Sequence, residues 1–127
     1  MYEAITRDIR VSVTPQFLDG ESRPEIGKYF WAYTVMIENE GSETVQLKSR
    51  YWQITDATGK VSEVRGAGVV GEQPVIEPGS GFEYTSGCPL PTPFGSMAGS
   101  FEMQRADGTR FEAEVGLFEL VQPQSIH

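Results

Sequence analysis

The sequence contains almost none of the side chains on which most catalytic and metal sites depend. Its 127 residues include one cysteine, Cys88, and one histidine, His127, which is the last residue. A single cysteine excludes an intrachain disulfide, and no serine–histidine–aspartate or cysteine–histidine pair can be held accurately by a terminal residue. Transition-metal sites need clusters of histidine or cysteine. We therefore expect no enzymatic activity, no metal site and no cofactor.

Positive charge and long apolar runs are also scarce. Ten lysines and arginines against eighteen aspartates and glutamates give a net charge of −8, whereas binding to phosphate backbones needs a basic surface. No apolar run approaches the roughly 20 residues of a membrane span, and the N-terminal residues lack the apolar core of a signal peptide. These absences predict a cytoplasmic protein that binds neither nucleic acid nor membranes.

Strand patterns are present throughout, and no segment has the periodicity of an amphipathic helix. Apolar and polar residues alternate over residues 8–18, 28–39, 44–56, 60–65, 81–86, 97–105 and 109–115, and a further apolar set lies at 116–121. Both faces of 28–39 are apolar, so this strand should be central, whereas Pro15 places the first strand at an edge or a bend. Asp107-Gly108 predicts a two-residue hairpin turn. About seven strands in one domain predict an all-β, immunoglobulin-like or fibronectin type III-like β-sandwich.

The alternation within residues 44–56 contains a break. Val45 and Leu47 occupy odd positions, whereas Trp52 and Ile54 occupy even ones. Both pairs can face the same core only if one extra residue intervenes, because side chains alternate between the two faces of a strand. The sequence therefore predicts a β-bulge at residues 49–51.

Residues 65–99 hold eight of the fourteen glycines and five of the eight prolines. Glycine adopts positive φ at little cost, and proline fixes φ and removes a hydrogen-bond donor. Such a composition predicts a shaped loop system, not a helix. We interpret this stretch as the surface that bears the functional site and the rest of the chain as its scaffold.

Residues 66–71 match the G-x-G-x-x-G pattern of dinucleotide-binding folds. That motif must open a helix, but Pro74 and Pro78 follow closely and exclude one. A narrower hypothesis remains, in which the amides of Gly66, Gly68 and Gly71 form an anion-binding nest beside Arg65. The alternative is that the glycines serve ordinary turn geometry.

Two further positions are candidates for partner binding. Arg50, Tyr51 and Trp52 form a basic-aromatic group on a strand. The usual burial of tryptophan favours Trp52 in the core and Arg50 exposed, and the sharper hypothesis makes Arg50 and the outward aromatics a protein-binding hot spot. Phe94, in the segment 92–95, is either a core plug or an exposed anchor, and the sequence does not separate these.

Many short motifs, in order along the chain, resemble the ApaG family, which is also called CorD. They are Tyr33-Thr34-Val35, Ile37-Glu38-Asn39, Arg50-x-Trp52-x-Ile54-x-Asp56, Gly66-x-Gly68-Val69-Val70-Gly71-Glu72-Gln73-Pro74, Pro78-Gly79, Phe82-x-Tyr84-x-Ser86-Gly87, Thr92-Pro93-x-Gly95-x-Met97-x-Gly99 and Phe118-x-Leu120. The resemblance runs from about Ile9 to Leu120, and the length suits a stand-alone bacterial member. It implies one ApaG domain over residues 1–127 with a fibronectin type III-like fold.

The resemblance implies little about mechanism. No catalytic residues are established for the family, and its bacterial genes tend to lie beside those for a ribosomal RNA dimethyladenosine transferase and a diadenosine tetraphosphatase. The family name has also been linked to cobalt and magnesium tolerance. Similar domains in eukaryotic F-box proteins and in a DNA polymerase-interacting protein look like protein-binding modules.

The leading hypothesis is therefore a non-enzymatic binding module. It would present the 65–99 stretch and a sheet edge to a protein partner, and β-augmentation or homodimerisation through that edge is the expected mode. The alternative is a binder of a phosphorylated small molecule, such as a nucleotide or pyrophosphate with magnesium, through the residues 66–71 and Arg65. A weaker third hypothesis gives the carboxylates a role in divalent-cation homeostasis.

Overall fold

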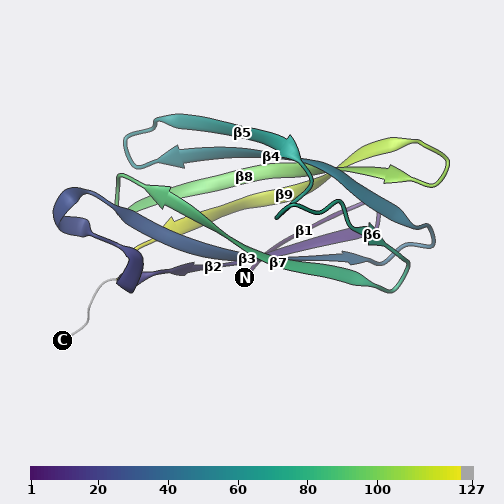
Figure 1. Ribbon diagram of the computed structural model, residues 1–127, viewed down its shortest axis with the longest axis horizontal. Coiled ribbons are helices and arrows are strands. Elements are labelled where there is room, and N and C mark those ends of the chain that lie inside the picture. The colour runs from purple at the N-terminus through teal and green to yellow at the C-terminus, as the bar shows by residue number, and fades with distance from the viewer. Residues whose placement is uncertain (124–127) are drawn as a thin grey trace.

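The computed structural model describes residues 1–123 as two antiparallel sheets packed face to face (Figure 1). The elements are β1 (Tyr2–Thr6), β2 (Ile9–Phe17), the 3-10 turns η1 (Asp19–Glu21) and η2 (Pro24–Ile26), β3 (Tyr29–Asn39), β4 (Val45–Asp56), β5 (Val61–Ala67), β6 (Val75–Ile76), β7 (Gly81–Leu90), β8 (Phe94–Arg105) and β9 (Arg110–Val121). One sheet has the order β1-β2-β3-β7 and the other β5-β4-β8-β9, with β6 paired to β4. The predicted all-β sandwich is confirmed, with nine strands in this part of the chain instead of about seven.

Strand β3 is central, as its two apolar faces predicted. It lies between β2 and β7, and the residues of its inner face are almost completely buried. The position of Pro15 also agrees with the prediction. β1 pairs only with residues 9–13 of β2, so that β2 is an edge strand where the proline stands, and no ladder hydrogen bond is lost.

The predicted bulge in β4 exists, but it lies one residue earlier than expected. The register between β4 and β8 skips Lys48, between Leu47 and Ser49, and Val45, Leu47 and Trp52 all reach the core. The turn at Asp107-Gly108 differs as well. The amide of Arg105 bonds to the carbonyl of Thr109, so three residues form the loop, and Gly108 takes φ +85°.

The interpretation of residues 65–99 as a loop system is wrong for most of its length. β6, β7, the end of β5 and the start of β8 occupy it, and the loops that remain cover residues 68–74, 77–80 and 91–93. Several of the glycines serve sheet packing instead. A Cβ at Gly99 would collide with the carbonyl oxygen of Tyr51, and one at Gly87 would lie 2.6 Å from the Phe30 ring.

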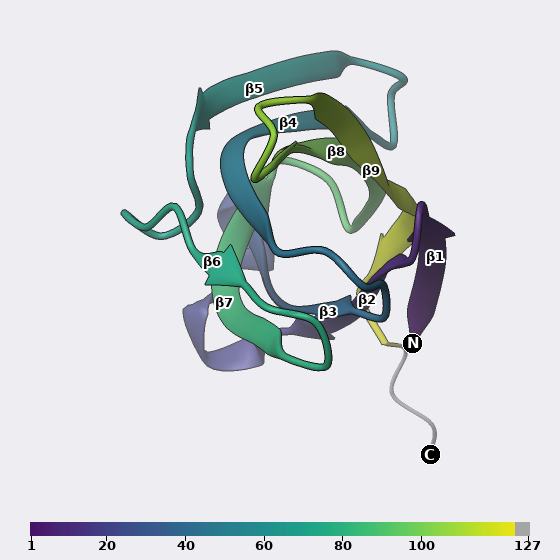
Figure 2. The same cartoon turned by 90° about the vertical axis from the view of Figure 1, so that its right-hand side faces the viewer.

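The two sides of the sandwich differ (Figure 2). On one side, β1 and β2 pack against β9, and the amide of Glu114 donates to Oγ1 of Thr6 at 3.0 Å. On the other side, β5 and β7 form the neighbouring sheet edges and do not pair with each other. Within the described residues, no helix has the length and apolar character needed to cross a membrane.

Candidate functional site

The side of the sandwich between β5 and β7 opens into a cleft of about 420 Å³. Side chains of β4, β5 and β7 line its walls, and the buried residues Tyr33 of β3 and Trp52 of β4 form its floor. The residues that matter for its chemistry are Tyr33, Arg50, Trp52, Ser62, Ser86 and Cys88. Apolar and polar side chains are therefore mixed on one concave surface, as is typical of binding pockets.

The bulge in β4 determines which side chains enter this cleft. Beyond Lys48 the even-numbered residues face the interior, so Arg50 and Trp52 share the inner face and Tyr51 lies on the outer one. β5 continues the same face, because Gly66 pairs with Arg50 and Val64 pairs with Trp52. The expectation that Trp52 is buried is confirmed, whereas the expectation that Arg50 is exposed is wrong. Arg50 is half-buried, and the group Arg50–Trp52 is divided between two faces.

Arg50 is fixed by the glycine-rich loop. Its Nη1 donates to the carbonyl oxygens of Ala67 at 3.1 Å and Gly68 at 3.0 Å. A Cβ at Gly66 would lie 2.8 Å from both terminal nitrogens of this guanidinium. A side chain at position 66 would therefore displace the guanidinium from the place that it occupies.

The other two glycines of the motif shape the turn that follows. The amides and carbonyls of Val69 and Glu72 bond to each other at 2.8 and 2.9 Å, and Val70 and Gly71 between them have φ of +43° and +80°. Two positive φ values in a two-residue turn are the mark of type I′. Gly68 has φ +62°, and a Cβ there would collide with the carbonyl oxygen of Glu72. The side chain of Val69 is 1% exposed and belongs to the hydrophobic core.

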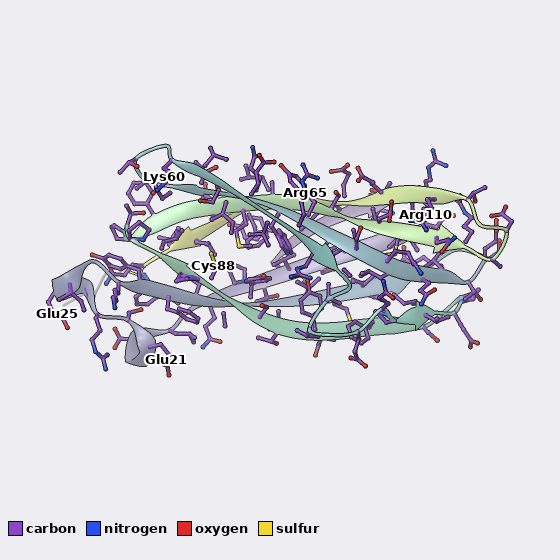
Figure 3. The ribbon with its side chains drawn as sticks, turned by 45° about the horizontal axis from the view of Figure 1, so that its top comes forward. Glu21, Glu25, Lys60, Arg65, Cys88 and Arg110 are labelled. Atoms are coloured by element: carbon purple, nitrogen blue, oxygen red, sulfur yellow. The ribbon has the colours of Figure 1, made fainter. Side chains whose placement is uncertain are left out.

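The structure does not bring Arg65 to this loop. Arg65 pairs with Tyr51 on the outer face, and its guanidinium lies 4.3 Å from the centre of the tyrosine ring and 3.5 Å from Glu63. Figure 3 shows Arg65 on the outer side of the upper sheet and Cys88 between the two sheets. The amide of Gly68 donates to the carbonyl of Lys48 at 2.9 Å. The cation beside the glycines is thus Arg50, which the break in alternation could have revealed.

Phe94 lies far from Arg50. Arg50 pairs with Phe101, which lies seven residues from Phe94 along β8, or about 23 Å of strand. Phe94 is 53% exposed and borders a separate surface hollow with Leu117 and Val121. It is therefore not a core plug, and the two predicted partner-binding residues do not form one patch.

Tyr33 and Cys88, which line the cleft, and Tyr84, which is buried on β7, have shifted pKa values. Burial raises the pKa of Tyr33 and, more strongly, that of Tyr84, and the nearby charge of Arg50 opposes both shifts. Ser86 also lowers the pKa of Tyr33 through a hydrogen bond between the side chains. Burial raises the pKa of the Cys88 thiol to about 11. The thiol is protonated at neutral pH, so the cleft offers hydrogen-bond donors and a cation but no thiolate nucleophile.

Metal ligands do not gather in the described part of the chain. No group of three or more histidine, cysteine, aspartate or glutamate residues within 1–123 could hold an ion, and His127 lies outside the described residues. The arrangement in the cleft is suited to holding an anionic or hydrogen-bonding group, because it combines a half-buried guanidinium with tyrosine and serine hydroxyls.

Comparisons with known proteins agree on one family. The family model described as the ApaG domain matches residues 19–105. Protein ApaG of Rhodospirillum centenum is 58% identical over 123 residues, which cover 97% of this chain and 95% of the relative, and Protein ApaG of Brucella suis biovar 1 is 56% identical over 124 residues, which cover 98% and 95%. A crystal structure from Bordetella pertussis, of a protein described as ApaA, superposes with a TM-score of 0.90 at 49% identity and covers 93% of this chain and 96% of that one. The chain therefore belongs to the ApaG family.

Proposed function

We propose that this chain is a non-enzymatic binding module that takes an extended segment of a partner protein into the cleft between β5 and β7. One observation carries the proposal: two sheet edges without strand partners border the same cleft. Across residues 1–123, β5 pairs only with β4, and β7 pairs only with β3. A free edge presents a row of main-chain donors and acceptors to which another extended chain can add.

The surface of the cleft supports a polypeptide occupant. Val64, Trp52 and Leu90 supply apolar contacts, and Ser62 and Ser86 supply hydroxyls beside them. A polypeptide alternates main-chain polar groups with side chains, and it can use both kinds of contact at once. Pro89 ends the stretch of β7 that a new strand could follow, because proline has no N–H to donate.

A nucleotide or pyrophosphate bound by the glycine loop receives less support. Of the three amides proposed for the nest, that of Gly68 donates to the carbonyl oxygen of Lys48, and Arg65 contacts Tyr51 and Glu63 on the outer face. These groups would have to leave their partners before they could form an anion nest.

The proposal can be tested with a display library of random twelve-residue peptides selected on the full chain. We expect selected peptides to bind saturably with micromolar affinity and to shift the amide resonances of β5 and β7. The matched variants are Ser62→Tyr and Glu63→Tyr, which are neighbours on β5. Ser62 lines the cleft, whereas Glu63 accepts a hydrogen bond from Tyr51 on the outer face. Ser62→Tyr should weaken peptide binding about tenfold or more by filling the cleft, and Glu63→Tyr should change it little.

Three results would contradict the proposal. Selection could yield no saturable binder, the shifts could fall outside β5 and β7, or Glu63→Tyr could weaken binding as much as Ser62→Tyr. The molecular mass of the free protein in solution shows whether it is a monomer or a dimer. A dimer that forms through β5 or β7 and excludes peptides would make a second copy of this chain the occupant and would replace the proposal.

A further inference from the structure

We infer that Arg50 recognises a carboxylate, and that the segment held between β5 and β7 carries this group at the loop end of the cleft. The role of a protein segment rests on the proposed function above. The carboxylate site itself rests on the geometry of Arg50 and the groups around it.

Arg50 retains donors that the protein does not use. A guanidinium has five N–H groups, and Nη1 bonds to the carbonyls of Ala67 and Gly68. In residues 1–123, neither Nε nor Nη2 forms a hydrogen bond, and no carboxylate forms an ion pair with Arg50. Arg10 and Arg110, by contrast, each pair with a glutamate. Nε and Nη2 form one edge of the guanidinium, which matches the two oxygens of a carboxylate.

The guanidinium is held before any ligand arrives. Its two carbonyl acceptors precede the type I′ turn, and Gly66 leaves space for it alone. A bidentate contact from a fixed arginine loses less side-chain entropy than one from a mobile arginine or lysine. The strained positive φ of Val70 belongs to the same turn, so the loop that orders Arg50 is maintained at a cost in backbone energy.

A buried tyrosine hydroxyl on β7 lacks a hydrogen-bond partner. Tyr84 is 7% exposed, and its oxygen is the one buried side-chain polar atom of the described residues without a hydrogen bond. The ring of Tyr84 packs edge-on against Phe101, the residue that pairs with Arg50 across β4 and β8. An unpaired buried hydroxyl is unfavourable, and a carboxylate drawn to Arg50 would bring an acceptor close to it.

The acidic side chains within residues 1–123 do not pair with Arg50. Asp56 also lines the cleft, but it lies six residues farther along β4, where its carboxylate accepts hydrogen bonds from the amides of Thr58 at 2.8 Å and Lys60 at 3.1 Å. Glu63 lies on the outer face with Tyr51. With a net charge of −8, the protein repels anions in general. Binding of a carboxylate therefore depends on the local guanidinium and should be specific to it.

The test follows the Nε–H resonance of Arg50 during titration with small probes. The probes are N-acetylglycine, which has a terminal carboxylate, N-acetylaspartate amide, which has a side-chain carboxylate, inorganic phosphate, and chloride at matched ionic strength. We expect saturable shifts at Arg50 with at least one carboxylate and weaker, unsaturated shifts with phosphate and chloride. The stronger of the two carboxylates identifies the source, either a chain end or an acidic side chain.

Three variants separate recognition from folding. Arg50→Lys keeps the charge but loses the planar fork, and it should weaken carboxylate binding about tenfold. Tyr84→Phe leaves the contacts of Arg50 with the loop intact and should weaken it about two- to fivefold. Arg65→Gln, on the outer face, is the matched control and should leave it unchanged. Thermal unfolding of each variant shows whether the fold is preserved.

Saturation by phosphate as strong as that by carboxylate, or equal binding in Arg50→Lys and the natural sequence, would overturn the inference. So would selected peptides whose binding survives replacement of every acidic residue and amidation of the C-terminus. The two proposals can fail separately. Peptides that bind without a carboxylate would support the binding module and contradict the carboxylate site. Carboxylate binding at Arg50 without any peptide binder would support the carboxylate site and contradict the binding module.

Discussion

The two sides on which the sheets meet are built differently. On the β1–β9 side, the rings of Tyr2 and Phe118 pack with their centroids 6.0 Å apart, and a hydrogen bond joins Thr6 to Glu114. On the β5–β7 side, the half-buried Arg50 lines an open cleft, and β7 carries the unpartnered hydroxyl of Tyr84. The first side holds the sheets together with apolar contacts, and the second keeps polar groups that add little to stability. We infer that stability and recognition are divided between these two sides.

The largest expected effect comes from breaking the closed side. Phe118 is fully buried on β9 and contacts the rings of Tyr2, Tyr33 and Trp52. Phe118→Ala should lower the free energy of unfolding by about 3–5 kcal/mol, from lost burial and the cavity left behind. The matched change on the open side, Val64→Ala, should cost about 0.5 kcal/mol or less, because Val64 is 38% exposed.

Urea unfolding followed by tryptophan fluorescence measures both values. If Phe118→Ala leaves too little folded protein, Phe118→Leu gives a smaller loss from the same position. Equal losses at positions 64 and 118 would mean that the open side contributes as much to stability as the closed one, and the division between the two sides would be wrong.

The second effect concerns the loop that closes one end of the open side. Gly68→Ala puts a side chain at φ +62°, where its Cβ would collide with the carbonyl oxygen of Glu72. The loop must shift, and we expect a loss of about 2–3 kcal/mol together with a looser Arg50. Gly71→Ala is the matched control, because Gly71 also has positive φ but no atom within 4 Å of its Cβ. It should cost only about 1 kcal/mol.

Unfolding in urea gives the stability of both variants, and the Nε–H resonance of Arg50 reports on the loop. An equal loss in the two variants would show that φ alone requires glycine at position 68. The close approach of Glu72 would then have no part in holding Arg50.

The contrast between the two sides also shows what the sequence could predict. Strand β3 and the bulge in β4 could be predicted, because side-chain alternation is a local property of a strand. β1 was missed, because YEAIT has charged and small residues in place of a clear apolar face. The composition predicts a loop beyond residue 86, because Gly87 and Pro89 are typical of turns, but β7 continues to Leu90. Packing of Phe30 against Gly87 requires the glycine, and tertiary contact overrides local composition here.

The candidate site was only partly predictable for the same reason. The sequence predicts a site at the glycine motif with Arg65, the neighbour in sequence, as its cation, whereas the guanidinium that bonds to this loop is that of Arg50. In a strand, adjacent residues point to opposite faces, so Arg65 and Gly66 cannot serve one site. Arg50 reaches the loop across the β4–β5 ladder. Pairing of distant residues depends on register, which composition and motif spacing do not determine.

The smallest expected effect tests how far the open side admits water. Cys88 lines the cleft but is only 2% exposed, and burial raises its thiol pKa from 9.0 to about 11. Between pH 9 and 11 the unfolded chain loses this proton while the folded chain keeps it, so the free energy of unfolding should fall as pH rises. The full shift corresponds to about 2–3 kcal/mol, and relaxation should reduce the observed change to about 1–2 kcal/mol. Tyr33 and Tyr84, whose pKa values are also raised, act in the same direction.

Urea unfolding from pH 8 to 11 measures this fall, and Cys88→Ala should reduce it without removing the part due to the tyrosines. At pH 8, a maleimide should label the thiol of the folded protein far more slowly than that of the unfolded chain, because only the thiolate reacts. Rapid labelling of the folded protein, with the same pH dependence in Cys88→Ala, would show that water reaches the wall of the cleft. The open side would then be filled with water. A protonated and slowly reacting thiol means instead that water is excluded from the wall of the cleft. A carboxylate at Arg50 would then be held in surroundings of low dielectric constant, where its attraction to the guanidinium is strongest.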